Sequence, residues 1–95
     1  MHIILLKFST QRARARDFMA AHNDWLREGF DAGVFLMSGS IQPSAGGAIL
    51  AHNATRDEIA ARVAADPFVV ESVVSAEIVE VTPSRLDARL SFLEA

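Results

Sequence analysis

The residues with the clearest chemical potential are a histidine and an aspartate that lie far apart in the sequence. His22 falls on the apolar stripe of a segment with helical spacing, and Asp66 stands directly before Pro67-Phe68. An imidazole titrates near neutral pH and acts as a general acid or base when a second group fixes its tautomer. A carboxylate that pairs with the ring is one way to fix it. The pair therefore predicts acid–base chemistry in a small pocket.

Each of these two residues also has a purely structural explanation. His22 could be a histidine at the edge of the core that is satisfied by a backbone carbonyl. Asp66 is expected at the C-terminal end of a helix, where the helix dipole disfavours a carboxylate by about 0.3–1 kcal/mol, so a donor such as His22 would offset that cost. An Asp-Pro pair by itself also makes a good turn. The residues alone leave these explanations open.

Five further residues are candidates for contact with a substrate. Ser38 is a hydroxyl in an apolar strand or at a strand bend, and Gly39 after it lets a ligand or another backbone come close. Gly47 belongs to a Gly-Gly pair, which turn chemistry assigns to a hairpin rather than to a phosphate cradle. Trp25 and Phe68 are either core residues or walls of a pocket for a small planar or apolar ligand.

The hydrophobic pattern predicts the elements that must position these residues. Strands are expected over 2–8, 34–41, 48–52 and 73–81, and helices from 9 or 10 to 31 and from 55 to 65. The order strand, helix, strand, strand, helix, strand is that of the ferredoxin-like β-α-β-β-α-β fold. The predicted fold class is therefore α+β, with both helices on one face of an antiparallel sheet.

Local signals mark several boundaries. Thr55 and Glu58 match a capping box at the start of the second helix, and the segment 43–47 is the strongest turn signal. The pair Thr82-Pro83 offers a cap and a first helical residue. The segment 83–95 is thus expected to be a short C-terminal helix or tail, with leucines at helical spacing: Leu86, Leu90 and Leu93.

Length and composition indicate one domain over residues 1–95 that buries apolar surface against a second copy. The chain has 95 residues, of which 51% are hydrophobic, and a domain of this size buries a smaller share of its surface than a larger one. The strands place apolar residues on both faces of the sheet, whereas helices are expected on one face only. A homodimer that packs sheet against sheet around a barrel-like shared core would cover the other face.

Several other functions are disfavoured by the sequence. The net charge is −3, and the only basic cluster, Arg12, Arg14 and Arg16, has alternate spacing without interleaved aromatic residues, so nucleic acid is not an expected partner. His2 and His52 have no second ligand at a suitable spacing, which argues against a metal. Neither glycine-rich nucleotide fingerprint is present, so no cofactor is expected.

The compartment is predicted from the lack of targeting signals. The chain has no cysteine, so it forms no disulfide and tolerates a reducing compartment. Its first apolar run is too short for a signal peptide, and no stretch approaches the ~20 apolar residues of a membrane span. We therefore expect a cytoplasmic protein without a membrane partner.

Taken in order, these residues resemble the YciI-like (YCII-related) family over nearly the whole chain. The resemblance rests on His22, the approach 32–35 to Ser38-Gly39-Ser40, the pair Gly46-Gly47 and the triplet Asp66-Pro67-Phe68. It implies a dimeric α+β barrel of ferredoxin-like protomers, with His22 and Asp66 as the paired site residues and Ser38 nearby.

The resemblance has one departure and implies no particular substrate. The family often has Gly-Pro after the second strand, whereas here Gly39 is followed by Ser40 and the proline comes at Pro43. The wider superfamily of dimeric barrels includes isomerases, lyases and oxygenases that act on small, often aromatic, compounds. Such an analogy between folds is a weak warrant for function.

Three hypotheses follow from the sequence. The first is a small cofactor-independent enzyme in which His22 and Asp66 carry out elimination or isomerisation on a small hydroxylated or carbonyl-bearing, often aromatic, compound. Ser38 or a glycine N–H would hold a substrate oxygen. The second is a non-catalytic protein that binds a small ligand in the same pocket or serves as an accessory protein. The third is that His22 and Asp66 only stabilise the fold.

Overall fold

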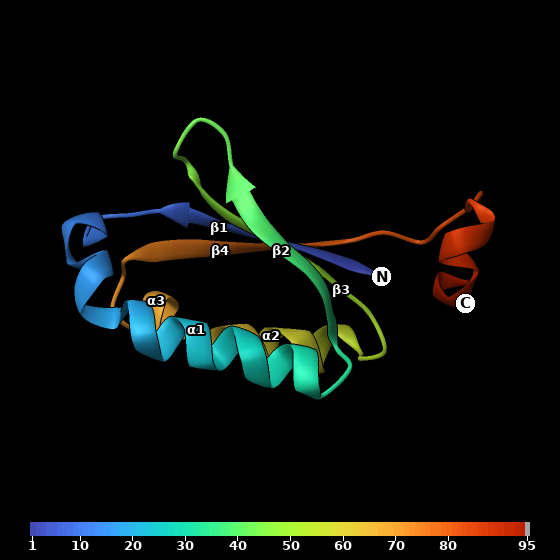
Figure 1. Ribbon diagram of the computed structural model, residues 1–95, viewed down its shortest axis with the longest axis horizontal. Coiled ribbons are helices and arrows are strands. Elements are labelled where there is room, and N and C mark those ends of the chain that lie inside the picture. Colours follow the sequence, from blue (N-terminus) through green and yellow to red (C-terminus); the bar gives the residue numbers. More distant parts are fainter. Residues whose placement is uncertain (95) are drawn as a thin grey trace.

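The order of elements predicted from the sequence is confirmed, and the three α-helices lie on one side of a four-stranded sheet (Figure 1). The coordinates are a computed structural model that describes residues 1–94. Residue 95, the last of the predicted domain and tail, lies outside the described residues. The elements are β1 (His2–Phe8), the 3₁₀ helix η1 (Arg12–Arg14), α1 (Ala15–Asp31), β2 (Phe35–Ile41), β3 (Gly46–Ala51), α2 (Arg56–Ala64), α3 (Pro67–Val70), β4 (Val74–Glu80) and the 3₁₀ helix η2 (Ala88–Leu93).

The sheet has the strand order β2-β3-β1-β4, and every neighbouring pair is antiparallel. Ile4 of β1 lies opposite Ile49 of β3 and Ile78 of β4. Because side chains alternate between the two faces of a strand, these three residues point to the same face. That face is the one covered by the helices.

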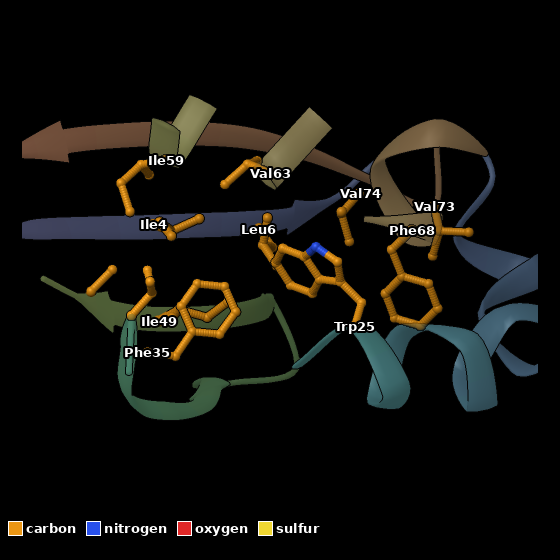
Figure 2. Close-up of a cluster of buried hydrophobic side chains, with 12 residues drawn as sticks. Ile4, Leu6, Trp25, Phe35, Ile49, Ile59, Val63, Phe68, Val73 and Val74 are labelled. Carbon is orange, nitrogen blue, oxygen red and sulfur yellow. The ribbon is translucent and has the colours of Figure 1, made fainter. Parts of the chain in front are cut away.

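The core fills the space between this face and the helices (Figure 2). Ile4 and Ile49 from the sheet are buried together with Ile59 from α2. Trp25 of α1 meets Phe35 of β2 edge to face, with ring centroids 5.2 Å apart. A Cβ at Gly29 would overlap the Phe35 ring, so this glycine allows α1 to lie close to β2.

The other face of the sheet is mostly apolar, although Lys7 and Glu77 also lie on it, and it carries no α-helix within residues 1–94 (Figure 1). By alternation it presents Leu5 and Leu50, which are half-buried, and Met37 and Val79, which are 47% and 37% exposed. None of the helices in the described part of the chain is long and apolar enough to cross a membrane.

The first helix begins later than the sequence predicts. We expected Ser9 or Thr10 to cap it, but α1 begins at Ala15 after the short η1, and its N-cap residue Arg14 provides no side-chain cap. The reason is tertiary, because the Ser9 N–H donates to the Val73 carbonyl at 2.9 Å. This segment is therefore tied to the start of β4 before the helix begins.

The turn predicted over 43–47 forms, but it does not include Gly46-Gly47, because both glycines belong to β3. The connection lies over residues 42–45, where Ser44 has a positive φ of 47° and the Gln42–Pro43 peptide bond is cis. Gly46 has φ 132°, and a Cβ there would overlap the Leu6 carbonyl oxygen of β1. The glycine is thus needed for close strand pairing rather than for a turn.

The C-terminal tail is helical only in part. The predicted cap at Thr82-Pro83 does not form, and Leu86 precedes the helix; η2 begins after Asp87, whose side chain accepts from the Arg89 N–H. Hydrogen bonds from the Arg89 side chain and then from its backbone lower the pKa of Asp87. Capping by an aspartate inside the tail therefore decides where its helix starts.

The capping box of α2 is confirmed and generates a stability prediction. The Glu58 N–H donates to Thr55 Oγ1 at 3.2 Å, and the Thr55 N–H donates to Glu58 Oε1 at 3.0 Å. We expect Thr55→Ala to lower the free energy of unfolding by about 1 kcal/mol in urea titrations. Thr82→Ala is the matched control, because Thr82 caps no helix, and an equal loss in both variants would contradict the prediction.

The stabilisation by this capping box should also depend on pH. The Thr55 backbone N–H, followed by its side chain, lowers the pKa of Glu58 from 4.5. A carboxyl group with a lowered pKa in the folded state stabilises the protein above its ordinary pKa and loses that effect as the pH falls through the folded value. The stabilisation of the wild type relative to Glu58→Gln, measured in the same urea titrations, should therefore shrink in acid, because the variant lacks the titrating carboxylate.

Candidate active site

His22 and Asp66 form a hydrogen-bonded pair although they are far apart in the sequence. Their Nδ1 and Oδ1 atoms are 2.7 Å apart, and the side chains are 12% and 0% exposed. An ionised carboxylate can only accept a hydrogen bond, so Nδ1 carries the proton and donates it. In the neutral ring this assignment leaves Nε2 with a free electron pair, which is the form a general base needs.

Asp66 holds its position because it also caps a helix. Asp66 follows the C-terminus of α2, as expected, because α2 ends at Ala64 and the Asp66 N–H donates to the Val63 carbonyl at 3.1 Å. The sequence did not predict that Asp66 is also the N-cap of α3, whose first residue is Pro67. Its Oδ1 accepts the Phe68 N–H at 3.0 Å. A carboxylate is favourable at this end of a helix, so the motif Asp-Pro-Phe fixes the acceptor independently of His22.

Burial makes this carboxylate sensitive to the loss of a partner. Oδ1 accepts both hydrogen bonds, whereas Oδ2 is buried without a partner among residues 1–94. A buried charge is costly unless donors compensate it. The hydrogen bond from the His22 ring therefore offsets part of the free-energy cost of burying the Asp66 carboxylate. The carboxylate in turn fixes the orientation of the ring.

Aromatic side chains fix the plane of the imidazole. The Phe68 ring stacks on His22 with centroids 4.0 Å apart and an interplanar angle of 5°. The Trp25 ring also stacks on the His22 imidazole, with ring centroids 5.7 Å apart. Its indole N–H donates to the Arg62 carbonyl at 2.9 Å, which holds the indole in place. The imidazole is thus restrained both by its hydrogen bond and by stacking.

His22 lines a pocket between α1 and the sheet. The pocket has a volume of about 270 Å³. Most of its wall is apolar, and the polar side chains in it are His22, Asn23, Ser38 and Ser40. The apolar side chains of the wall come from three strands, β1, β3 and β4, and from two helices, α1 and α3: Leu6, Phe8, Met19, Leu26, Ile49, Phe68 and Val74.

The structure brings most of the candidate residues from the sequence to this pocket. Ser38, Gly39, Gly47 and Phe68 line it together with His22. Asp66 lies behind the imidazole rather than in the wall. Trp25 does not line the pocket either, because it is only 6% exposed and belongs to the core.

Sequence reasoning missed Ser40 and Asn23 as lining residues. Ser40 lies opposite Gly47, as Ser38 lies opposite Ile49. Residues two apart in a strand share a face, so the spacing of the two serines was a signal for Ser40. Asn23 follows His22 directly, and no comparable pattern points to it.

The fold and the site together define a class: a ferredoxin-like α+β domain with a pocket histidine that a buried aspartate orients. The chain belongs to the YCII-related domain family, whose model matches residues 1–84. This confirms the resemblance inferred from the sequence. No curated protein matches the chain.

One solved structure with a similar fold is 5-chloro-2-hydroxyhydroquinone dehydrochlorinase (TftG) from Burkholderia phenoliruptrix AC1100, in complex with 2,5-dihydroxybenzoquinone. The match has a TM-score of 0.69 and 15% identity, and it covers 85% of this chain and 93% of that chain. TftG therefore supports the α+β fold, and at this identity the likeness shows the fold alone.

The tautomer of His22 tests whether the pair exists in solution. We expect Asp66→Asn to shift His22 away from the Nδ1–H form, because an amide is a weaker acceptor than a carboxylate and places an NH₂ group without a partner in a buried site. Nitrogen-15 shifts of the two ring atoms report the tautomer. His52 in the same spectra is an internal control that should not change, and an unchanged His22 would refute the pairing.

Proposed function

We propose that this protein is a small enzyme in which His22 moves a proton on a bound organic molecule. The observation that carries the proposal is the 2.7 Å contact between His22 Nδ1 and Asp66 Oδ1, in a histidine that lines an apolar pocket. Such a contact leaves Nε2 as the basic atom. Asp66 orients the ring and stabilises the positive charge that forms on it.

The reaction that suits these groups is elimination or isomerisation. His22 Nε2 accepts a proton from a hydroxyl or from an acidic C–H of the substrate. In an elimination, the electron pair left behind forms a double bond and expels a leaving group with its bonding pair; in an isomerisation, the proton returns to another atom. Ser38 donates a hydrogen bond to a substrate oxygen, with the glycine N–H groups of the pocket as the other candidates.

The size and polarity of the pocket favour a single-ring substrate with oxygen substituents. An apolar cavity of about 150 Å³ accommodates benzene, and this pocket measures about 270 Å³. Its walls are mostly apolar, and two hydroxyls lie on β2. The dehydrochlorinase with the similar fold holds a dihydroxylated quinone, which supports this substrate class by analogy only.

A non-catalytic ligand-binding or accessory protein is the alternative function. The observation that favours it is the mostly apolar wall of the pocket, which suits a small ring compound whether or not a proton is moved. A binding protein would gain thermal stability when the same ring compounds bind, and it would release them chemically unchanged.

We also propose that the protein is a homodimer. Leu5 and Leu50 on the open face of the sheet, together with the exposed Met37 and Val79, form an apolar surface of the kind that marks an interface. A second copy packed on the same surface through a two-fold axis would cover it on both protomers.

Turnover distinguishes the enzyme from the binding protein. We expect wild-type protein to release chloride from chlorinated single-ring hydroxylated compounds, with 5-chloro-2-hydroxyhydroquinone as the first test compound. His22→Ala should lower kcat/KM by about 10²–10⁴ because the general base is lost, and Asp66→Asn should also lower it. His52→Ala is the control. Binding without turnover would favour the alternative, and turnover unaffected by His22→Ala would refute the mechanism.

The dimer proposal predicts that a charged residue on the face of the sheet without helices lowers the mass of the particle in solution. Leu50→Lys should convert a dimer to a monomer in sedimentation velocity runs, because burying a lysine in an apolar interface is costly. Val70→Lys is the control, since Val70 is 62% exposed on α3 in the helical layer and should leave the dimer intact. A monomeric wild type would overturn the proposal.

A further inference from the structure

A second hollow adjoins the pocket at the hairpin end of the sheet. It is lined by Phe8, Arg12, Ser40, Gln42, Ser44 and Gly46. Three of these residues, Phe8, Ser40 and Gly46, also line the pocket that contains His22. The two spaces are therefore neighbours that share part of their lining.

Arg12 is held in place at this second hollow. Its guanidinium lies over the Phe8 ring, with Cζ 4.2 Å from the centroid, and one of its N–H groups donates to the Ser44 carbonyl at 3.1 Å. A guanidinium has five N–H donors in a planar fork, so these contacts orient it while leaving donors for another group. Because the stacked side chain is already restrained, it loses less conformational entropy when a ligand binds than a free surface arginine does.

The lining of the two spaces includes a basic side chain but no acidic one. Arg12 is the only lysine or arginine among the lining residues, and none of those residues is an aspartate or a glutamate. The whole chain, by contrast, has a net charge of −3. Among residues 1–94 the Arg12 guanidinium has no carboxylate partner, and a positive group of this kind beside a pocket is suited to an anionic ligand.

We infer that Arg12 forms an anion subsite and that the substrate is a single-ring hydroxylated compound with a carboxylate. The ring lies in the pocket beside His22, and the carboxylate extends past Ser40 toward the guanidinium. The side chains of Ser40 and Gln42 line the same path and supply further hydrogen-bond donors. The inference rests on the proposed function, because it extends the site of His22 by one substrate group.

A pair of probes that differ only in the carboxylate tests the subsite. We expect wild-type protein to bind 2,5-dihydroxybenzoate about two- to fivefold more tightly than hydroquinone, the range that an exposed ion pair supplies. Isothermal titration calorimetry gives both dissociation constants, and the advantage should shrink as sodium chloride is added because salt screens exposed charges.

Matched arginine variants separate the subsite from a structural role. Arg12→Gln should abolish the preference for the acid, and Arg12→Lys should keep part of it because the charge remains. Arg14→Gln is the control: Arg14 also stacks on an aromatic ring, that of Phe18 at 4.9 Å, but it lines neither space. A preference that survives in Arg12→Gln, or is lost equally in Arg14→Gln, would overturn the inference.

The outcomes also distinguish this inference from the proposed function. If both probes perturb the His22 ring in NMR spectra but bind equally well, the anion subsite is refuted while the acid–base site stands. Failure of both probes to bind also refutes the subsite for this substrate class. Halide release and its loss in His22→Ala do not depend on Arg12, so the proposed function is judged by them separately.

Discussion

The hydrogen bond between His22 and Asp66 is the contact on which the rest of the site depends, because it joins two elements that are 44 residues apart in sequence. Asp66 is fixed first by its own helix, through the Phe68 N–H. Phe68 then stacks on the imidazole. The triplet Asp66-Pro67-Phe68 therefore provides the hydrogen-bond acceptor, the start of α3 and the ring that restrains His22. As a result, the packing of the helices sets the direction in which Nε2 points.

Features that depend on neighbours in sequence could be predicted from the sequence. The capping box of Thr55 and Glu58 and the first strand, His2–Phe8, lie where the pattern places them. The helical spacing of His22 and Trp25 correctly predicts that both lie on the inner side of α1. Periodicity fixes which side of an element faces the core, and this sufficed to place the imidazole beside the sheet.

Features that depend on tertiary contacts could not be predicted in this way. Asp66 reads as the end of one helix, whereas it caps the next, because a four-residue helix such as α3 has no periodicity to detect. Gly46 reads as a turn, whereas it is needed where the Leu6 carbonyl of β1 comes close. The spacing of Trp25 fits either the core or a pocket wall, and its burial among the core residues, at 6% exposed, is a tertiary fact that decides for the core.

The alternation of the strands separates the pocket from the open face of the sheet. Leu6 and Ile49 line the pocket, whereas their neighbours Leu5 and Leu50 point to the other side. The proposed second copy would therefore cover one face while the helices and the substrate occupy the other. The strands β1 and β3 therefore support both faces, with the pocket on one and the proposed interface on the other.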